Sequence, residues 1–145
     1  MRNFIDPDMS LERFVQAQDD TYASALNEIK QGKKNSHWMW YIFPQIKGLG
    51  YSYTAQYYAI QTKQEAEEFL QHPILAARLY EITNELLKID GKNASEIFGY
   101  PDDMKLKSSM TLFYLVSHND IFLNVLEKFF SGELDINTVK IWEKI

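Results

Sequence analysis

The chain has 145 residues, which is the usual length of one domain and leaves no room for two. Hydrophobic residues make up 46% of the sequence and charged residues 24%, so a hydrophobic core can form without disulfides or metal sites. Cysteine is absent, which excludes a disulfide framework, a thiolate nucleophile and a cysteine-containing metal site. The net charge of −5 argues against the broad basic face with which proteins bind duplex DNA.

The sequence predicts neither a signal peptide nor a membrane span. Acidic residues stand within residues 1–8, where a signal peptide needs an apolar stretch. The longest apolar run, residues 38–44, is far shorter than the ~20 residues that a membrane-spanning helix needs. We therefore expect a cytoplasmic protein that makes no contact with a membrane.

The first part of the chain carries apolar residues at helical spacing. This pattern predicts one helix over residues 11–31, with Ser10 as its N-cap and Gly32 just past its end. Gln18 lies within the apolar stripe, where an amide is costly without partners. We expect Gln18 either to pin a neighbouring loop by hydrogen bonds or to face a ligand pocket. Residues 38–43 could form a buried helix or strand, and the lack of a pairing strand favours a short buried helix.

Residues 45–53 are expected to form a loop, and helical segments follow it. These segments cover residues 54–60, 63–72, 73–89, 94–98, 104–117, 121–130 and 137–143. Capping boxes of Thr62 with Glu65 and of Asn93 with Glu96 begin two of these helices, and Pro73 begins a third. The sequence therefore predicts an all-α fold, a compact single-domain orthogonal bundle of about seven or eight helices over residues 1–145.

The common sequence motifs of catalysis are missing. The chain has no Gly-rich phosphate loop, dinucleotide-binding motif, paired-histidine zinc helix or nucleophile elbow. Its three histidines, His37, His72 and His118, are spread along the chain and give weak grounds for a metal site. We therefore expect neither a metal nor a cofactor.

The aromatic run SHWMWYIFPQ, residues 36–45, is the first segment with unusual chemistry. Most of its bulk is expected in the core, because this much aromatic surface stabilises a fold wherever it is buried. A pocket wall is the alternative. An indole of Trp38 or Trp40 would then face a heteroaromatic ligand, with Ser36 and His37 at one end of the run and Gln45 at the other.

The second such segment, residues 102–111, begins with two acids and continues with lysines and hydroxyls. On a helix, Lys105, Ser108 and Ser109 share one face, with Asp102 near its start. Lysine and free N–H groups at a helix N-terminus can form an anion site. The alternative is a capped helix whose charged residues are solvated and whose small residues permit close packing.

Three strings, SHWMWYIFPQ, GLGYS and IFGYPDDMKLKSSMTLF, resemble those of a bacterial family of unknown function whose members are often labelled "calpastatin". The resemblance implies a compact all-helical domain and supplies no catalytic residues. It does not imply calpain inhibition, because calpastatin repeats are disordered and this chain has a periodic core. The pattern of aromatic, lysine and acidic motifs is also similar to that of a helical superfamily acting on ADP-ribose derivatives.

The leading functional hypothesis is a pocket that binds a nucleotide-like molecule such as an ADP-ribose derivative, and its extension is hydrolysis of that molecule. The acid–base candidates are His37, Asp102 and Asp103. The ligand-binding candidates are Gln18, Ser36, Trp38, Trp40, Gln45, Tyr57, Arg78, Lys105, Ser108 and Ser109. The hypothesis requires residues 36–45 and 102–109 to meet in space.

Two other functions compete with this hypothesis. A protein-interaction module of a bacterial stress, toxin–antitoxin or defence system would expose some of Trp38, Trp40, Tyr57 and Tyr58 as anchors. Nucleic-acid binding through Lys33 and Lys34 is disfavoured, since two lysines on an acidic protein give little attraction for phosphates.

Overall fold

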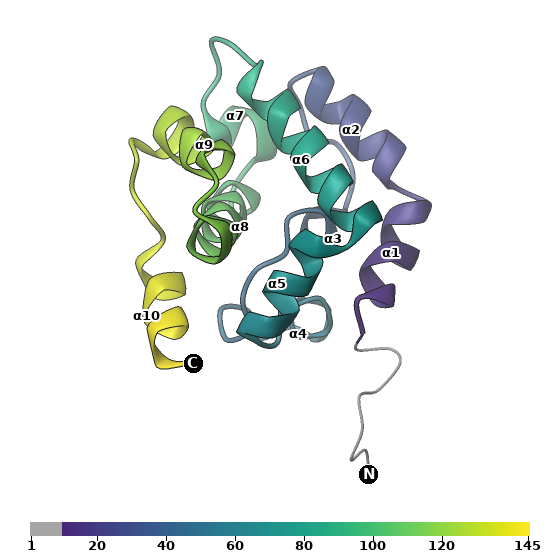
Figure 1. The fold of residues 1–145 in the computed structure, drawn as a ribbon. Helices are drawn as coiled ribbons and strands as arrows, with labels where there is room; N and C mark the ends of the chain where they lie inside the picture. The colour runs from purple at the N-terminus through teal and green to yellow at the C-terminus, as the bar shows by residue number, and fades with distance from the viewer. Residues whose placement is uncertain (1–9) are drawn as a thin grey trace.

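The computed structural model describes residues 10–145, and the signal-peptide argument from residues 1–8 lies outside this range. Within it the chain forms ten α-helices (Figure 1). They are α1 (Glu12–Asp19), α2 (Tyr22–Lys30), α3 (Met39–Ile42), α4 (Tyr53–Tyr57), α5 (Lys63–Gln71), α6 (Pro73–Leu87), α7 (Ala94–Phe98), α8 (Asp102–Ser117), α9 (Asp120–Phe130) and α10 (Ile136–Lys144). No strand occurs in this part of the chain, so the all-α prediction is confirmed for it.

Helix α6 lies at the centre of the bundle, with α2 packed on one side and α9 on the other (Figure 1). Helix α8 packs against α9, and α10 packs against α8. A chain of phenyl rings joins four helices through the core, since Phe14 contacts Phe69, Phe69 contacts Phe113 and Phe113 contacts Phe122, with centroids 5.3, 5.2 and 5.8 Å apart. All four rings are fully buried, which makes this contact chain part of the main hydrophobic core.

The single helix predicted over residues 11–31 is corrected to two, α1 and α2. The break falls at Asp20 and Thr21, whose residue types have low helix propensity. Thr21 has a φ of −127°, and its hydroxyl donates to the carbonyl of Ala17 at 2.8 Å, a local bond that competes with the helix. This break adds one helix, and residues 10–145 contain ten helices where the sequence predicted about seven or eight.

The short buried helix predicted in the aromatic run is confirmed as α3. The capping box of Asn93 and Glu96 is confirmed too, with both reciprocal hydrogen bonds in place. The box predicted for Thr62 is only half formed. Thr62 accepts from the Glu65 N–H at 3.0 Å, but the Glu65 carboxylate accepts from the Gln61 N–H at 2.9 Å. Glu65 is therefore free to pair with a residue from outside its own helix.

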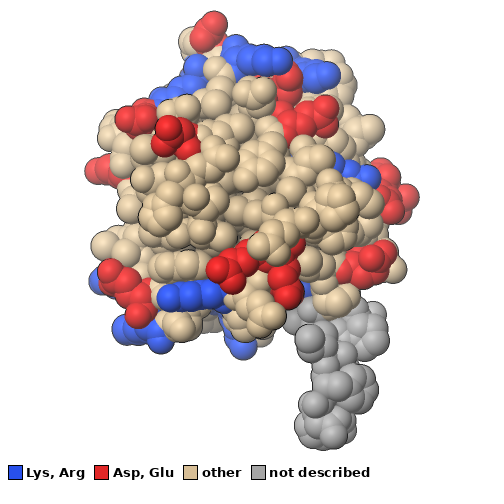
Figure 2. Space-filling view, in the orientation of Figure 1, with Lys and Arg blue, Asp and Glu red and all other residues tan. Residues whose placement is uncertain are grey.

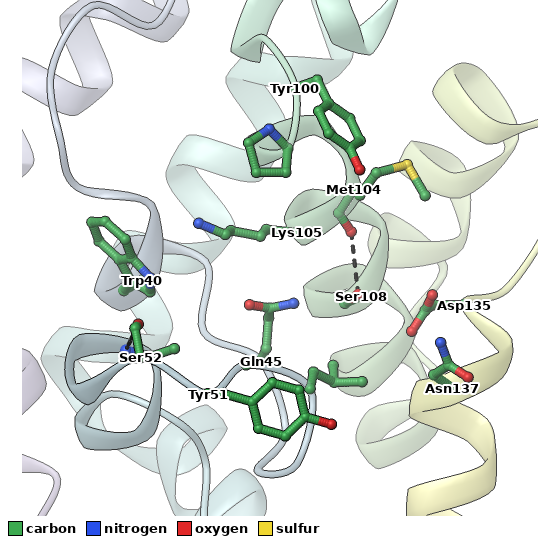
Figure 3. Close-up of a pocket in the computed structure, with 14 residues that line it drawn as sticks. Trp40, Gln45, Tyr51, Ser52, Tyr100, Met104, Lys105, Ser108, Asp135 and Asn137 are labelled. Atoms are coloured by element: carbon green, nitrogen blue, oxygen red, sulfur yellow. Dashed lines mark hydrogen bonds between the residues drawn. The ribbon is translucent and has the colours of Figure 1, made fainter.

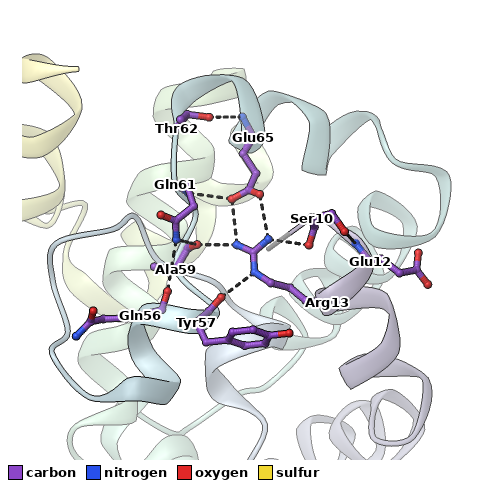
Figure 4. A network of polar contacts seen from close by, with 9 residues as sticks. All are labelled: Ser10, Glu12, Arg13, Gln56, Tyr57, Ala59, Gln61, Thr62 and Glu65. Atoms are coloured by element: carbon purple, nitrogen blue, oxygen red, sulfur yellow. Dashed lines mark hydrogen bonds and ion pairs between the residues drawn. The ribbon is translucent and has the colours of Figure 1, made fainter. Parts of the chain in front are cut away.

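That residue is Arg13 of α1, which is only 3% exposed (Figure 4). Its two terminal nitrogens donate to both Glu65 oxygens at 3.0 and 3.1 Å. Its remaining N–H groups donate to the carbonyls of Tyr57 at 2.7 Å, Ser10 at 2.7 Å and Ala59 at 2.8 Å. Guanidinium has five N–H donors, and all five are used. One side chain thus fixes α1, the end of α4 and the start of α5 relative to one another.

We expect Arg13→Lys to lower the free energy of unfolding by about 3 kcal/mol, because an ammonium has three donors where the site needs five and each lost charged hydrogen bond costs about 1.5–3 kcal/mol. Urea denaturation followed by circular dichroism measures the change. Arg78→Lys is the matched control, since Arg78 pairs with Asp19, whose side chain is 56% exposed, and we expect a loss below about 1 kcal/mol. Equal losses for the two variants would contradict the structural role of Arg13.

Candidate functional site

A cleft of about 630 Å³ lies between the segment from α3 to α4, the first turns of α8 and the start of α10 (Figure 3). Its lining residues are Trp40, Gln45, Leu49, Gly50, Tyr51, Ser52, Ala55, Tyr100, Pro101, Met104, Lys105, Ser108, Asp135 and Asn137. Trp40 and Gln45 come from the aromatic run, and Lys105 and Ser108 come from the Lys-Ser-Ser segment. The structure therefore brings these two segments together.

The position of Gln45 is set by a short backbone pairing. The Gln45 carbonyl accepts from the Ile60 N–H at 2.8 Å, and the Ile60 carbonyl accepts from the Lys47 N–H at 2.9 Å. The side-chain amide of Gln45 has no hydrogen-bond partner within residues 10–145, and it points into the cleft between Trp40 and Ser108 (Figure 3). An amide in this position can both donate to and accept from a ligand.

The wall beside Gln45 requires a glycine. A Cβ placed on Gly50 would lie 2.6 Å from the Cβ of Ala55 in α4, closer than two carbon atoms can approach. The loop can therefore fold against α4 only because this position lacks a side chain. This close approach places Tyr51 at the rim of the cleft, where its side chain is 85% exposed.

Lys105 forms the opposite wall and is held by two partners. Its ammonium lies 4.5 Å from the ring centroid of Trp40 and 3.2 Å from a carboxylate oxygen of Asp102. The other Asp102 oxygen lies 2.9 Å from the ammonium of Lys34, which in turn lies 5.1 Å from the ring centroid of Trp38. One carboxylate thus joins two lysine–tryptophan pairs, of which only the pair of Lys105 and Trp40 lines the cleft.

Trp38 lies in the core rather than in the cleft. It is 1% exposed, and its indole N–H donates to Glu28 at 2.9 Å. Ser36 also binds Glu28, through both its N–H and its hydroxyl. His37 is exposed but is not a lining residue, and its carbonyl accepts from the Tyr41 hydroxyl at 3.3 Å. Residues 36–38 therefore anchor the chain between α2 and α3, and the cleft receives only the later part of the aromatic run.

Glu28 accepts the hydrogen bonds that hold residues 36–38 in place, and these bonds change its pKa. Burial raises the pKa of Glu28, but hydrogen bonds from the Ser36 hydroxyl, the Asn35 N–H and the Trp38 indole outweigh burial, so the pKa lies below its ordinary value. Because the folded pKa is depressed, the carboxylate contributes stability that is fully present above the unfolded pKa of about 4.3. That contribution is lost as the pH falls through the folded pKa.

We expect Glu28→Gln to lower the free energy of unfolding by about 1 kcal/mol at pH 7, since the charge that strengthens these hydrogen bonds is lost. The difference from wild type should shrink as the pH falls below about 4, where Glu28 itself becomes protonated. Urea denaturation at pH 7, 5 and 3.5 measures both effects. Glu67→Gln, at an exposed position of α5, is the control and should change little. A loss that stayed constant from pH 7 to 3.5 would contradict the role of the Glu28 carboxylate.

Three other predicted ligand residues lie outside the cleft lining. Gln18 donates to the Tyr41 carbonyl at 2.8 Å and accepts from Arg78 at 3.4 Å, which corresponds to the loop-pinning alternative. Arg78 also pairs with Asp19 at 3.0 Å. The ring of Tyr57 packs against Tyr53 and Tyr58, with centroids 6.0 and 4.8 Å apart. These contacts tie helices and loops together outside the cleft.

The first turn of α8 uses its own polar groups. The N–H groups of Asp103, Met104 and Lys105 donate to the carbonyls of Gly99 and Pro101 at 2.9–3.2 Å. Asp103 also accepts from the Met104 N–H at 2.9 Å, and neither Asp103 nor Asp102 is a lining residue. These N–H groups, expected to bind an anion, are thus already satisfied. The capped-helix alternative is not matched in full either, because α8 has no side-chain cap and Asp102 pairs with Lys34 and Lys105.

Two adjacent serines of α8 have different surroundings. Ser108 lines the cleft and donates to the Met104 carbonyl at 3.2 Å. Ser109 is fully buried and is not a lining residue, and its hydroxyl has no hydrogen-bond partner among the described residues. Only one of the pair can therefore contact a molecule in the cleft.

Several cleft residues were not singled out from the sequence as site residues. Tyr51 and Tyr100 stand in the strings GLGYS and FGYPDD. Their position in these motifs was the only sequence feature that could have marked them as site residues. Asp135 and Asn137 carried no signal, because they lie at the start of a helix predicted to begin one residue late. Of the lysine pair proposed for nucleic acid, Lys34 is held by Asp102 inside the protein.

No group of three or more His, Cys, Asp or Glu side chains within residues 10–145 is placed to hold a metal ion. None of the helices described combines the length and the apolar character that crossing a bilayer demands.

The fold and the cleft define the class: an all-α domain with a cleft walled by aromatic, amide and lysine side chains. The chain belongs to the family described as "protein of unknown function (DUF1810)", whose model matches residues 8–142. It is similar to the conserved hypothetical protein Rv1873 from Mycobacterium tuberculosis, known from a crystal structure at 1.38 Å. The two are 44% identical over 95% of this chain and 99% of that one, with a TM-score of 0.92. No curated protein matches the chain. The family description carries no calpastatin label.

Proposed function

We propose that the cleft binds a small nucleotide-like molecule. The observation that carries the proposal is the convergence of Trp40 and Gln45 with Lys105 and Ser108, although about 60 residues separate the two pairs in the sequence. A volume of about 630 Å³ lies within the range of about 300–1,000 Å³ that is common for small-molecule sites. Aromatic walls with a few converging polar groups are the usual composition of such sites.

Each side chain has a distinct part in this proposal. The partly exposed indole of Trp40 offers a flat surface for a heteroaromatic ring. The Gln45 amide has no hydrogen-bond partner in residues 10–145, so it can form hydrogen bonds with polar groups at the edge of that ring. Lys105 supplies one cation for a phosphate or another acceptor. Arg78 lies elsewhere, so a two-cation clamp on a diphosphate is not part of the proposal.

Binding is better supported than hydrolysis. The predicted acid–base residues His37, Asp102 and Asp103 are not lining residues, so none of them faces a ligand directly. The carboxylate that does line the cleft is Asp135. An ADP-ribose derivative stays within the proposed ligand class, and incubation with the protein followed by chromatography shows whether such a ligand is cleaved.

We expect nucleosides, nucleotides or ADP-ribose to bind wild-type protein in calorimetry. Trp40→Ala should weaken the binding by about 5- to 150-fold, because stacking of a base on an aromatic side chain contributes about 1–3 kcal/mol. Lys105→Ala should weaken binding of phosphorylated ligands by about tenfold, since a charged hydrogen bond is lost.

The chain offers matched controls for each change. Trp142→Ala removes an indole of α10 that does not line the cleft, and Lys107→Ala removes the lysine two residues from Lys105, which pairs with Glu133 instead. Ser108→Ala and Ser109→Ala change adjacent hydroxyls, of which only the first faces the cleft. The controls Trp142→Ala, Lys107→Ala and Ser109→Ala should leave binding within about twofold. If wild-type protein bound none of these ligands, the proposal would be wrong.

A protein-interaction module is the second candidate, favoured by exposed aromatic side chains. Tyr51, Tyr53 and Tyr100 are 85%, 81% and 82% exposed, and few Lys, Arg, Asp or Glu side chains lie in the middle of the face shown in Figure 2. Exposed tyrosines and charge-poor surfaces are enriched at protein interfaces. A partner that co-purifies stoichiometrically from the native cell, and is lost with Tyr53→Ala but not with Trp40→Ala, would favour this function over ligand binding.

A further inference from the structure

A carboxylate with a free oxygen lies at the end of the cleft away from Trp40. Asp135 precedes α10, and one of its oxygens accepts from the N–H of Thr138 at 3.0 Å and from its hydroxyl at 2.6 Å. The other oxygen accepts no hydrogen bond from residues 10–145, although Asp135 lines the cleft. In Figure 3 this side chain lies across the cleft from Trp40, beyond Ser108.

The neighbouring amide complements this carboxylate. Asn137 lies in the first turn of α10, two residues after Asp135, and also lines the cleft. Its side-chain amide makes no hydrogen bond within the described part of the chain. A carboxylate oxygen accepts two hydrogen bonds, and the amide both donates and accepts. The two side chains together can therefore receive two neighbouring hydroxyl groups, each of which donates one hydrogen bond and accepts another.

The charges around the cleft disfavour a phosphate at this end. Asp135 and Lys105 are the charged residues among those that line the cleft, and the Lys105 ammonium lies at the other end, 4.5 Å from the ring centroid of Trp40. The Thr138 N–H, which an anion at the start of α10 would use, is already bonded to Asp135. A phosphate offers only acceptors, so beside Asp135 it would meet a like charge and few donors.

We propose that Asp135 and Asn137 form a subsite for the vicinal hydroxyls of a ribose-like sugar and that Asp135 excludes phosphate from it. The inference rests on the proposed function, because the base of the same ligand would lie on Trp40. The ligand then spans the cleft, with its ring at α3 and its sugar at the start of α10. Specificity at the sugar comes from a charge-assisted hydrogen bond that an analogue without hydroxyls cannot make.

The test compares ribonucleosides with their 2′,3′-dideoxy analogues in calorimetry. Adenosine, guanosine, cytidine and uridine are titrated into wild-type protein, each beside its dideoxy counterpart and its 5′-monophosphate. We expect at least one ribonucleoside to bind about tenfold or more tightly than its dideoxy analogue, the effect of one lost hydrogen bond to a charged group.

Asp135→Asn is the main variant, because asparagine also caps helices well and should keep α10 in place. With this variant the preference for the ribonucleoside should fall to within about twofold, and binding of the monophosphate relative to the nucleoside should rise about threefold or more. Asn137→Ala should reduce the ribose preference without the gain in phosphate binding. Asp120→Asn, in the first turn of α9, is the matched control and should change neither ratio.

The outcomes separate this inference from the proposed function. If ribo and dideoxy ligands bind wild type equally and Trp40→Ala weakens both, the ligand site stands and the sugar subsite is overturned. If the ribose preference survives Asp135→Asn unchanged, the assignment of Asp135 is overturned. If no nucleoside or nucleotide binds wild type, the proposed function and this inference both fail.

Discussion

The guanidinium of Arg13 holds together parts of the chain that are more than forty residues apart. It donates to the carbonyls of Tyr57 and Ala59 and to the carboxylate of Glu65. Ile60, directly after Ala59, pairs with the backbone on either side of Ile46, and this pairing sets the position of Gln45. The cleft wall therefore depends on a buried charge that does not itself line the cleft. A buried guanidinium is stable only when every N–H donor has a partner. Both the fold and the position of Gln45 therefore require that the donors of Arg13 are all hydrogen-bonded.

Helical spacing, caps and turn residues were enough to predict the all-α class and most helix positions. The α7 capping box and the short helix α3 could be predicted because their signals are local in sequence. The break between α1 and α2 could not be predicted, because the apolar stripe continues across it. In the structure the Thr21 hydroxyl bonds to the Ala17 carbonyl at this break, and Gln18 bonds to the Tyr41 carbonyl. Neither contact is visible in the spacing of the apolar residues. Glu65 likewise satisfied a local capping pattern, yet its carboxylate is used by a distant arginine.

The candidate site could be predicted only in part, for a related reason. Residue type indicated which segments carry unusual chemistry, and Trp40, Gln45, Lys105 and Ser108 do line one cleft. Residue type could not distinguish Trp38 from Trp40, because which indole turns inward depends on Glu28, ten residues before Trp38. Nor could it distinguish Ser108 from Ser109, which differ only in the face of α8 they occupy. Asp135 was not predicted as a site residue, because it stands outside both unusual segments of the sequence and only the fold places it in the cleft.

The bridge formed by Asp102 has an optical consequence. Its two oxygens hold Lys34 and Lys105, and each ammonium lies over a different indole. A molecule that draws Lys105 away from Asp102 changes the electric field at Trp40 and, through Lys34, at the buried Trp38. The fluorescence emission of Trp38, which no ligand in the cleft touches, would then change when the cleft is filled. The two tryptophans linked through Asp102 would thus serve as an intrinsic fluorescent reporter of binding.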